Sequence, residues 1–272
     1  MLTNPPGEIY SLTLFGQRRV FINSVALLAE VCDEKRFSKS VGVALKELRA
    51  GIHDGLFTAH DGEKNWEVAH RVLVPAFGPL HMKDMFDDMK DIASQLVLKW
   101  ARMGAEYCVP AADDFTRLTL DTLALCAMSY RFNSFYKDEM HPFIDAMVNF
   151  LKVGGSKARR PNAMAAFFRA EDQQFDQGIE YMRKLSADLV RQRREHPTET
   201  KDLMNAMING KDPKTGESLT EDSIIDNMIT FLIAGHETTS GLLVSAWKFA
   251  ITTVHLLIKL TELLVVLYAQ VS

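Results

Sequence analysis

The feature that most constrains the fold is a long apolar stretch between residues 218 and 243 of the 272-residue chain. Ser218 and Glu221 stand three residues apart, which is the spacing of a capping box and predicts a helix start near residue 218. Apolar residues then recur at helical spacing until they cover almost the whole circumference: Ile224, Ile225, Met228, Ile229, Leu232 and Ile233. Such a pattern is typical of a buried helix that runs through the centre of a large domain.

A polar insert, Ala-Gly-His-Glu-Thr-Thr at positions 234–239, interrupts this predicted helix. Gly235 costs about 1 kcal/mol relative to alanine in a helix interior. The hydroxyl of Thr238 can donate to the carbonyl of residue 234 and bend the helix, and Glu237 is an ionisable group in a stretch predicted to be buried. Two interpretations stay open: a core helix with a kink, or a helix that passes close under a flat group and handles protons there.

The same insert begins like a zinc-binding helix, because His236 and Glu237 match the first half of the pattern H-E-x-x-H. That pattern needs a second histidine one turn later to complete the ligand set. Ser240 stands at that position, so the sequence excludes this kind of zinc site.

The segment 234–239 resembles the central oxygen-activation helix of the cytochromes P-450. The resemblance implies that Ala234 and Gly235 give room to a haem and to dioxygen. It also implies that Glu237 and Thr238 are the catalytic pair that relays protons during oxygen activation. This family binds its haem iron through a cysteine thiolate.

Two further segments match the same family. Trp66 and His70 lie one turn apart on a predicted helix, and the resemblance implies that they hold a haem propionate. The family usually has arginine where this chain has His70, and Arg71 follows directly. Phe57 matches a loop position where relatives place an aromatic ring over the distal haem face. Without the resemblance, the simpler interpretation of Trp66 is a partly buried tryptophan beside two solvated basic residues. The simpler interpretation of Phe57 is an ordinary buried phenylalanine.

The matches run in order from about Gly7 to about Val244, and they are closest to the self-sufficient fatty-acid hydroxylases. Those enzymes carry a haem domain fused to a flavin reductase. The resemblance therefore implies a fatty-acid-like substrate, dioxygen and electrons from NADPH. Related enzymes clamp the substrate carboxylate from the N-terminal strands, where this chain has Gln17 and Phe21, with Arg18 and Arg19 close by.

The predicted fold is mostly α with a small N-terminal β-sheet, a cytochrome P-450 fold truncated after the central helix. A strand pair is predicted between Gly7 and Asn23, with a turn at Gly16, followed by a short helix capped by Ser24. Helical patterns then occupy these ranges: 41–50, 66–76, 82–103, 116–130, 142–152 and 172–196.

The chain also departs from the family pattern. Cys32, Cys108 and Cys126 lie in or beside ordinary helix and strand patterns, without the glycine-rich loop that holds the family's haem ligand. We therefore expect residues 1–244 to form the N-terminal part of a haem domain, without the proximal cysteine or a reductase, and to be inactive alone. Residues 245–272 are expected to be an apolar tail unlike the family. The alternative function is a non-catalytic helical fragment that binds apolar ligands or a protein partner.

Composition excludes some partners. The chain has 31 Lys and Arg against 35 Asp and Glu, a net charge of −4, which argues against a nucleic-acid binder. The short basic cluster Arg191–Arg194 is predicted to be a solvated helix face. Three scattered cysteines indicate a reducing compartment, the first ten residues contain no apolar run, and charges interrupt the tail, so we expect a cytoplasmic protein without a clear membrane anchor.

Overall fold

The computed structural model describes residues 7–14, 17–104, 106–157, 160 and 167–271. The chain divides into two compact units, Met1–Val41 and Gly42–Ser272, and each is described by itself. Among the residues that the structure describes, no helix is both long enough and apolar enough to cross a membrane.

The first unit contains a β-hairpin and one short helix. Strands β1 (Ile9–Leu14) and β2 (Gln17–Ile22) pair antiparallel, and the stacked rings of Tyr10 and Phe21 lie 5.1 Å apart. Helix α1 (Val25–Val31) begins after Ser24, whose hydroxyl accepts a hydrogen bond of 3.3 Å from the Leu27 amide. The predicted strand pair and helix cap are confirmed, and the predicted turn at Gly16 lies outside the described residues.

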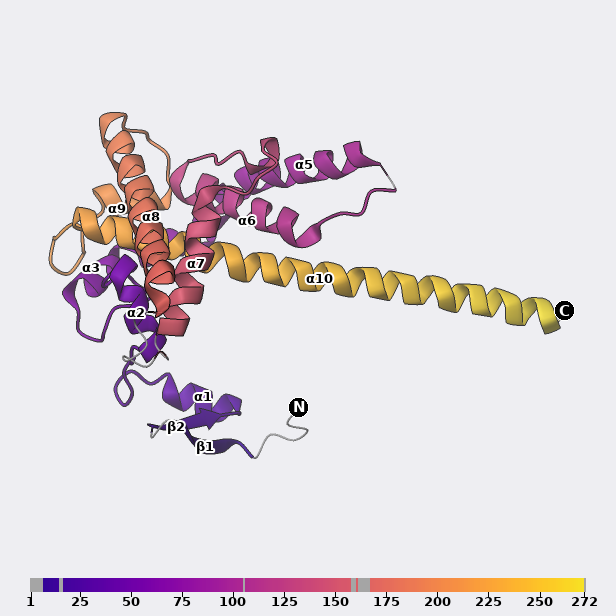
Figure 1. Ribbon diagram of the computed structural model, residues 1–272, viewed down its shortest axis with the longest axis horizontal. Coiled ribbons are helices and arrows are strands. Elements are labelled where there is room, and N and C mark those ends of the chain that lie inside the picture. The colour runs from indigo at the N-terminus through magenta and orange to yellow at the C-terminus, as the bar shows by residue number, and fades with distance from the viewer. Residues whose placement is uncertain (1–6, 15–16, 105, 158–159, 161–166, 272) are drawn as a thin grey trace. The chain divides into compact units, whose positions relative to one another are not determined.

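The second unit is helical, which confirms the predicted fold class (Figure 1). The predicted helix 82–103 is two helices, divided at Met85, and α9 was not predicted. The elements in chain order are α2 (Val43–Ile52), α3 (Lys64–Leu73), η1 (Val74–Phe77), α4 (Pro79–Asp84), α5 (Phe86–Met103), α6 (Ala111–Met128), η2 (Ser134–Tyr136), α7 (Pro142–Lys157), α8 (Arg169–Glu195), α9 (Leu203–Asn209) and α10 (Glu221–Val271).

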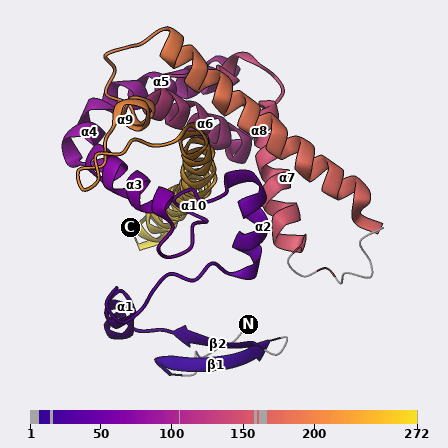
Figure 2. The same cartoon turned by 90° about the vertical axis from the view of Figure 1, so that its left-hand side faces the viewer.

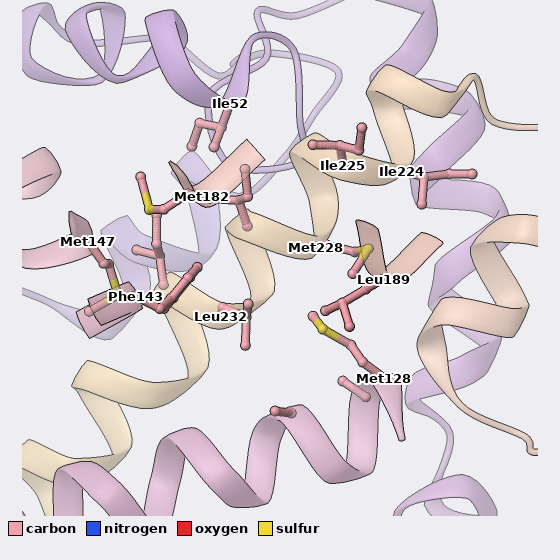
Figure 3. Close-up of a cluster of buried hydrophobic side chains, with 14 of the residues drawn as sticks. Ile52, Met128, Phe143, Met147, Met182, Leu189, Ile224, Ile225, Met228 and Leu232 are labelled. Carbon is pink, nitrogen blue, oxygen red and sulfur yellow. The ribbon is translucent and has the colours of Figure 1, made fainter. Parts of the chain in front are cut away.

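The first half of α10 is the centre of this unit. Figure 2 looks nearly along α10, which contacts α2, α6, α8 and α9. Its apolar side chains meet those of the surrounding helices in one buried cluster, in which Met228 and Leu232 lie beside residues of α6, α7 and α8 (Figure 3). Each large apolar side chain buried in this way contributes about 1.5–3 kcal/mol. The predicted central helix is therefore confirmed over residues 224–233.

The start of α10 differs from the prediction. The helix begins at Glu221, and its cap is Thr220, whose Oγ1 accepts a hydrogen bond of 3.2 Å from the Ser223 amide. A side-chain oxygen directly before the first helical residue can reach the free amides of the first turn. Ser218 lies two positions before this cap and too far from the helix for that role, so the predicted capping box was wrong.

A buried ion pair holds the ends of α6, α8 and α9 together. Arg193 is 9% exposed and donates to both carboxylate oxygens of Asp202, at 3.0 and 2.9 Å. It also donates to the Met128 carbonyl at 2.8 Å, and the Ser129 hydroxyl donates to Asp202 at 2.7 Å. The prediction that the basic cluster 191–194 is a solvated face was therefore wrong for Arg193.

Packing continues along α10 as far as Trp247. The Trp247 ring lies 5.2 Å from that of Trp100 on α5 and 6.2 Å from that of Phe115 on α6, centroid to centroid. Beyond it, Phe249, Ile251 and Val254 are exposed. The boundary that the sequence placed after Val244 stays a prediction.

Candidate functional site

The polar insert of α10 divides the helix into a buried and an exposed face. Ala234, Glu237 and Thr238 are exposed, whereas His236 and Ser240 are buried. Thr238 Oγ1 donates to the Ala234 carbonyl at 2.7 Å, as its position predicted. Glu237, however, is not buried. When apolar residues surround a whole helix, their spacing does not show which face the rest of the protein leaves exposed. In α10 the exposed face is the one that carries Glu237 and Thr238.

Gly235 lies against the neighbouring helix α6. A Cβ atom at this position would be 2.8 Å from Leu123 Cδ2, closer than side-chain carbons approach one another in folded proteins. The missing side chain therefore lets α6 pack tightly against α10 at the motif. The role of Gly235 in giving room to a haem stays a prediction.

His236 is the motif residue whose environment the sequence did not reveal. Its side chain is 2% exposed, and neither ring nitrogen has a hydrogen-bond partner among the described residues. Burial disfavours the charged imidazolium and lowers the pKa of His236 to about 4. The ring is therefore neutral in the folded chain at neutral pH.

Helix α3 brings Trp66 and His70 together as predicted. Their rings stack with centroids 4.8 Å apart and planes 19° apart. This follows from the helix pattern, because Val68, Ala69 and Leu73 occupy the buried face. Trp66 is half-buried and His70 is exposed. An indole N–H and an imidazole N–H on one surface form a donor set that suits a carboxylate.

Arg71, next in the sequence, has a different role. Its guanidinium donates from Nε and Nη2 to the two oxygens of Asp212, at 2.7 and 2.8 Å, and from Nη1 to Glu67 at 3.0 Å. These hydrogen bonds hold the pKa of the Asp212 carboxyl well below its usual range. Arg71 thus anchors the turn before α10 to α3, and His70 remains the basic residue beside Trp66.

Phe57 lies in the loop that joins α2 to α3 and is 43% exposed. The preceding residue is fixed to α10, because the Leu56 amide donates to Asn227 Oδ1 at 2.9 Å. The following residue is fixed to α2, because Thr58 Oγ1 donates to the His53 carbonyl at 2.8 Å. Asn227 precedes Ala234 by seven residues, or about 10 Å along the helix. The loop of Phe57 and the polar insert therefore share one rigid support.

The three cysteines lie apart from these groups. Cys126 is buried on α6, where desolvation raises the pKa of its thiol to about 11. Its Sγ lies 3.8 Å from the Met85 carbonyl, so it is a protonated core thiol. Cys32 and Cys108 are exposed. On β2, Arg19 shares a strand face with Phe21, and Arg18 faces the other way.

The structure brings together Trp66 with His70, and Ala234 with Glu237 and Thr238. Sequence reasoning missed the anchors of the Phe57 loop, although a charged and an amide residue, Asp226 and Asn227, inside the apolar run of α10 were a signal for them. The paired donors on α3 and the exposed polar face of α10 fit a flat cofactor with carboxylate groups. Haem has both properties.

Known proteins resemble this chain over most of its length. A bifunctional cytochrome P-450/NADPH–P-450 reductase of Aspergillus oryzae is 60% identical over 241 residues, covering 89% of this chain and 22% of the relative. A self-sufficient cytochrome P-450 monooxygenase of Exserohilum turcicum is 52% identical over 243 residues, covering 89% of this chain and 23% of the relative. The chain thus spans less than a quarter of these relatives. A model of the cytochrome P-450 family matches residues 1–251. With a family match that extends over more than nine-tenths of its residues, this chain belongs to the cytochrome P-450 family, whose cofactor is haem.

Proposed function

We propose that these residues form the distal part of a haem-dependent monooxygenase that hydroxylates a fatty-acid-like substrate with dioxygen and NADPH-derived electrons. The observation that carries this proposal is the exposed face of α10, on which Ala234, Glu237 and Thr238 stand side by side in a family member. The names of the relatives support the reductase as the source of electrons. The scattered cysteines favour a cytoplasmic location.

Each residue has a defined part in this proposal. Bound haem supplies the iron that activates dioxygen. The Glu237 carboxylate takes protons from water and passes them along the helix face. Thr238 Oγ1 donates its own proton to the Ala234 carbonyl, so its lone pairs are left to accept a hydrogen bond on the exposed side. The methyl group of Ala234 leaves this surface flat, and Phe57 provides an apolar wall.

We further propose that these 272 residues do not complete the reaction by themselves. Cys126 is a buried thiol with a raised pKa, and the two remaining cysteines are exposed. Cys126 therefore lacks the electropositive, partly exposed setting of a thiolate ligand, and the sequence around Cys32 and Cys108 lacks the glycine-rich loop of the family's haem ligand. The competing function, a helical fragment that binds apolar ligands or a protein partner without catalysis, predicts no specific haem binding.

Replacing Trp66 with phenylalanine should weaken haem binding by about 10- to 100-fold, because it removes one hydrogen bond to a charged group, worth about 1.5–3 kcal/mol, and keeps the ring stack. Titration of the chain with haem, followed by absorption, measures this affinity. His70→Leu should have a similar effect.

Trp100→Phe is the matched control, since its indole N–H donates to Asp114 at 2.7 Å and not to the proposed cofactor. Equal haem affinities for wild type and the Trp66 variant would contradict the proposed site. A strongly red-shifted Soret band after reduction under carbon monoxide would show that one of the three cysteines does ligate iron.

A further inference from the structure

A buried carboxylate near the start of α10 joins three segments of the second unit. Asp226 is 1% exposed, and its Oδ1 lies 3.1 Å from His53 Nδ1 at the end of α2. Arg183 of α8 donates from Nη1 to the same carboxylate, and also to the Gly51 carbonyl at 3.0 Å. We call His53, Arg183 and Asp226 the Asp226 cluster. It connects residues that are 173 and 43 positions apart in the sequence.

The backbone at His53 is strained and needs this support. His53 has φ of 28° and ψ of −112°, in a region that residues with a Cβ atom rarely adopt. Such a conformation costs about 1–3 kcal/mol and persists only where the surroundings hold it. His53 is also the residue at which the chain leaves α2 and turns into the loop that carries Phe57. Its conformation therefore sets the direction of that loop.

The next residues of the loop pass directly against α10. A Cβ atom at Gly55 would lie 3.1 Å from both the Ile52 carbonyl oxygen and Thr230 Oγ1 and 3.4 Å from Asp226 Cβ, so glycine permits this close approach without displacing these neighbours. One residue further, the Leu56 amide donates to Asn227. Asp226, Asn227 and Thr230 thus form the surface of α10 on which the loop rests, immediately before Phe57.

The charge on Asp226 depends on its partners. Burial alone raises the pKa of this carboxyl group, and the hydrogen bond and charge of Arg183 act in the opposite direction. A buried carboxylate that loses its partner destabilises its surroundings. Arg183 is held in place at its other end, where Nη2 donates to the exposed Asp222 at 2.9 Å. The ion pair is therefore a specific bridge between α8, α10 and the start of the loop.

We propose that the Asp226 cluster positions the Phe57 loop, and that Arg183 and Asp226 are positioning residues of the distal site. What Phe57 faces rests on the proposed function, whereas the anchoring of the loop does not. Arg183 links this loop to α8, so a shift of α8 would be transmitted to Phe57. Arg183, which contacts Asp226 and the Gly51 carbonyl, would then influence which part of a substrate chain the site presents.

The test is amide hydrogen exchange of the full chain, without haem, in wild type and in Arg183→Met. The informative amides are those of Leu56, Thr58 and Ala59, because the last two donate to the Gly55 carbonyl at 3.1 and 3.0 Å within the loop. Loss of the bridge should raise their exchange rates about tenfold or more, while amides of α6 and α7 stay within about twofold of wild type. Arg183→Lys, which keeps the charge, should restore much of the protection.

Arg191→Met is the control, since Arg191 lies on the same helix and pairs with Asp188 within that helix. It should leave the loop amides unchanged. Wild-type exchange in Arg183→Met, or an equal rise throughout the core, would overturn the proposal. If Arg183→Met does not fold, Asp226→Asn is measured instead, because this substitution keeps the size of the side chain and removes its charge. Faster exchange of the loop amides in Asp226→Asn supports the proposal, and wild-type exchange overturns it. Failure to bind haem, by contrast, would contradict the proposed function and leave these rates unaffected.

Discussion

Replacing Asp202 with alanine should lower the free energy of unfolding by about 3–5 kcal/mol, because the substitution leaves Arg193 buried without its counter-charge. The side chains of Arg193 and Asp202 are 8% and 2% exposed, so water cannot compensate for the loss. The same substitution removes the cap of α9, since Asp202 Oδ1 accepts a hydrogen bond of 2.8 Å from the Asn205 amide. With a domain stability of about 5–15 kcal/mol, this is a large fraction of the total.

Urea denaturation followed by circular dichroism measures this effect. Asp188→Ala is the matched control, because Asp188 pairs with Lys184 and Arg191 on the surface of α8, the helix that carries Arg193. Its denaturation midpoint should stay close to that of wild type, as exposed ion pairs contribute little. If both variants unfold at the wild-type midpoint, the buried pair does not hold α6, α8 and α9 together.

Acid should destabilise the chain between pH 6.5 and pH 4 through His236. The pKa of His236 is 6.5 in an ordinary environment and about 4 in the folded chain, because burial disfavours its charged form. Below pH 6.5 the unfolded chain therefore binds a proton that the folded chain does not, and stability falls until the pH reaches the folded pKa. The difference between these two pKa values corresponds to about 3 kcal/mol of unfolding free energy. Above pH 6.5 the ring is neutral in both states and contributes no pH dependence.

His236→Leu should remove this part of the acid sensitivity, since leucine carries no titrating group into the core. The quantity to compare is the change in unfolding free energy between pH 7 and pH 5, in the variant and in wild type. His196→Gln, at the exposed end of α8, is the control and should keep the wild-type pH dependence. A variant that loses as much stability as wild type over this range would show that His236 is not buried as a neutral ring.

The long helices could be predicted because their own residues specify them. The apolar spacing of α7 and α8 is complete within each segment, and both were placed to within a few residues at most boundaries. Helix α9 was missed because it has seven residues and depends on the Asp202 cap. Such a helix gains its stability from tertiary contacts, which sequence spacing does not contain.

The candidate site shows the same division. Trp66 and His70 could be placed together from the sequence, because one turn of helix separates them. The exposure of Glu237 could not be predicted from the sequence, because the apolar residues of α10 surround the helix and do not show which face is exposed. The partners of Asp226 are far away in the chain, so only its unexpected position within an apolar run pointed to a buried ion pair.

The contacts of α10 have a consequence for building chimeric enzymes from this chain and its relatives. Asp226, Asn227 and Thr230 support the Phe57 loop, and the polar insert begins at Ala234 on the same helix. A crossover placed between residue 62 and residue 226 would combine the loop of one parent with the supporting surface of another. Loops exchanged alone would lose their anchors, whereas a loop and a helix taken from one parent would keep the matched spacing between Phe57 and the polar insert.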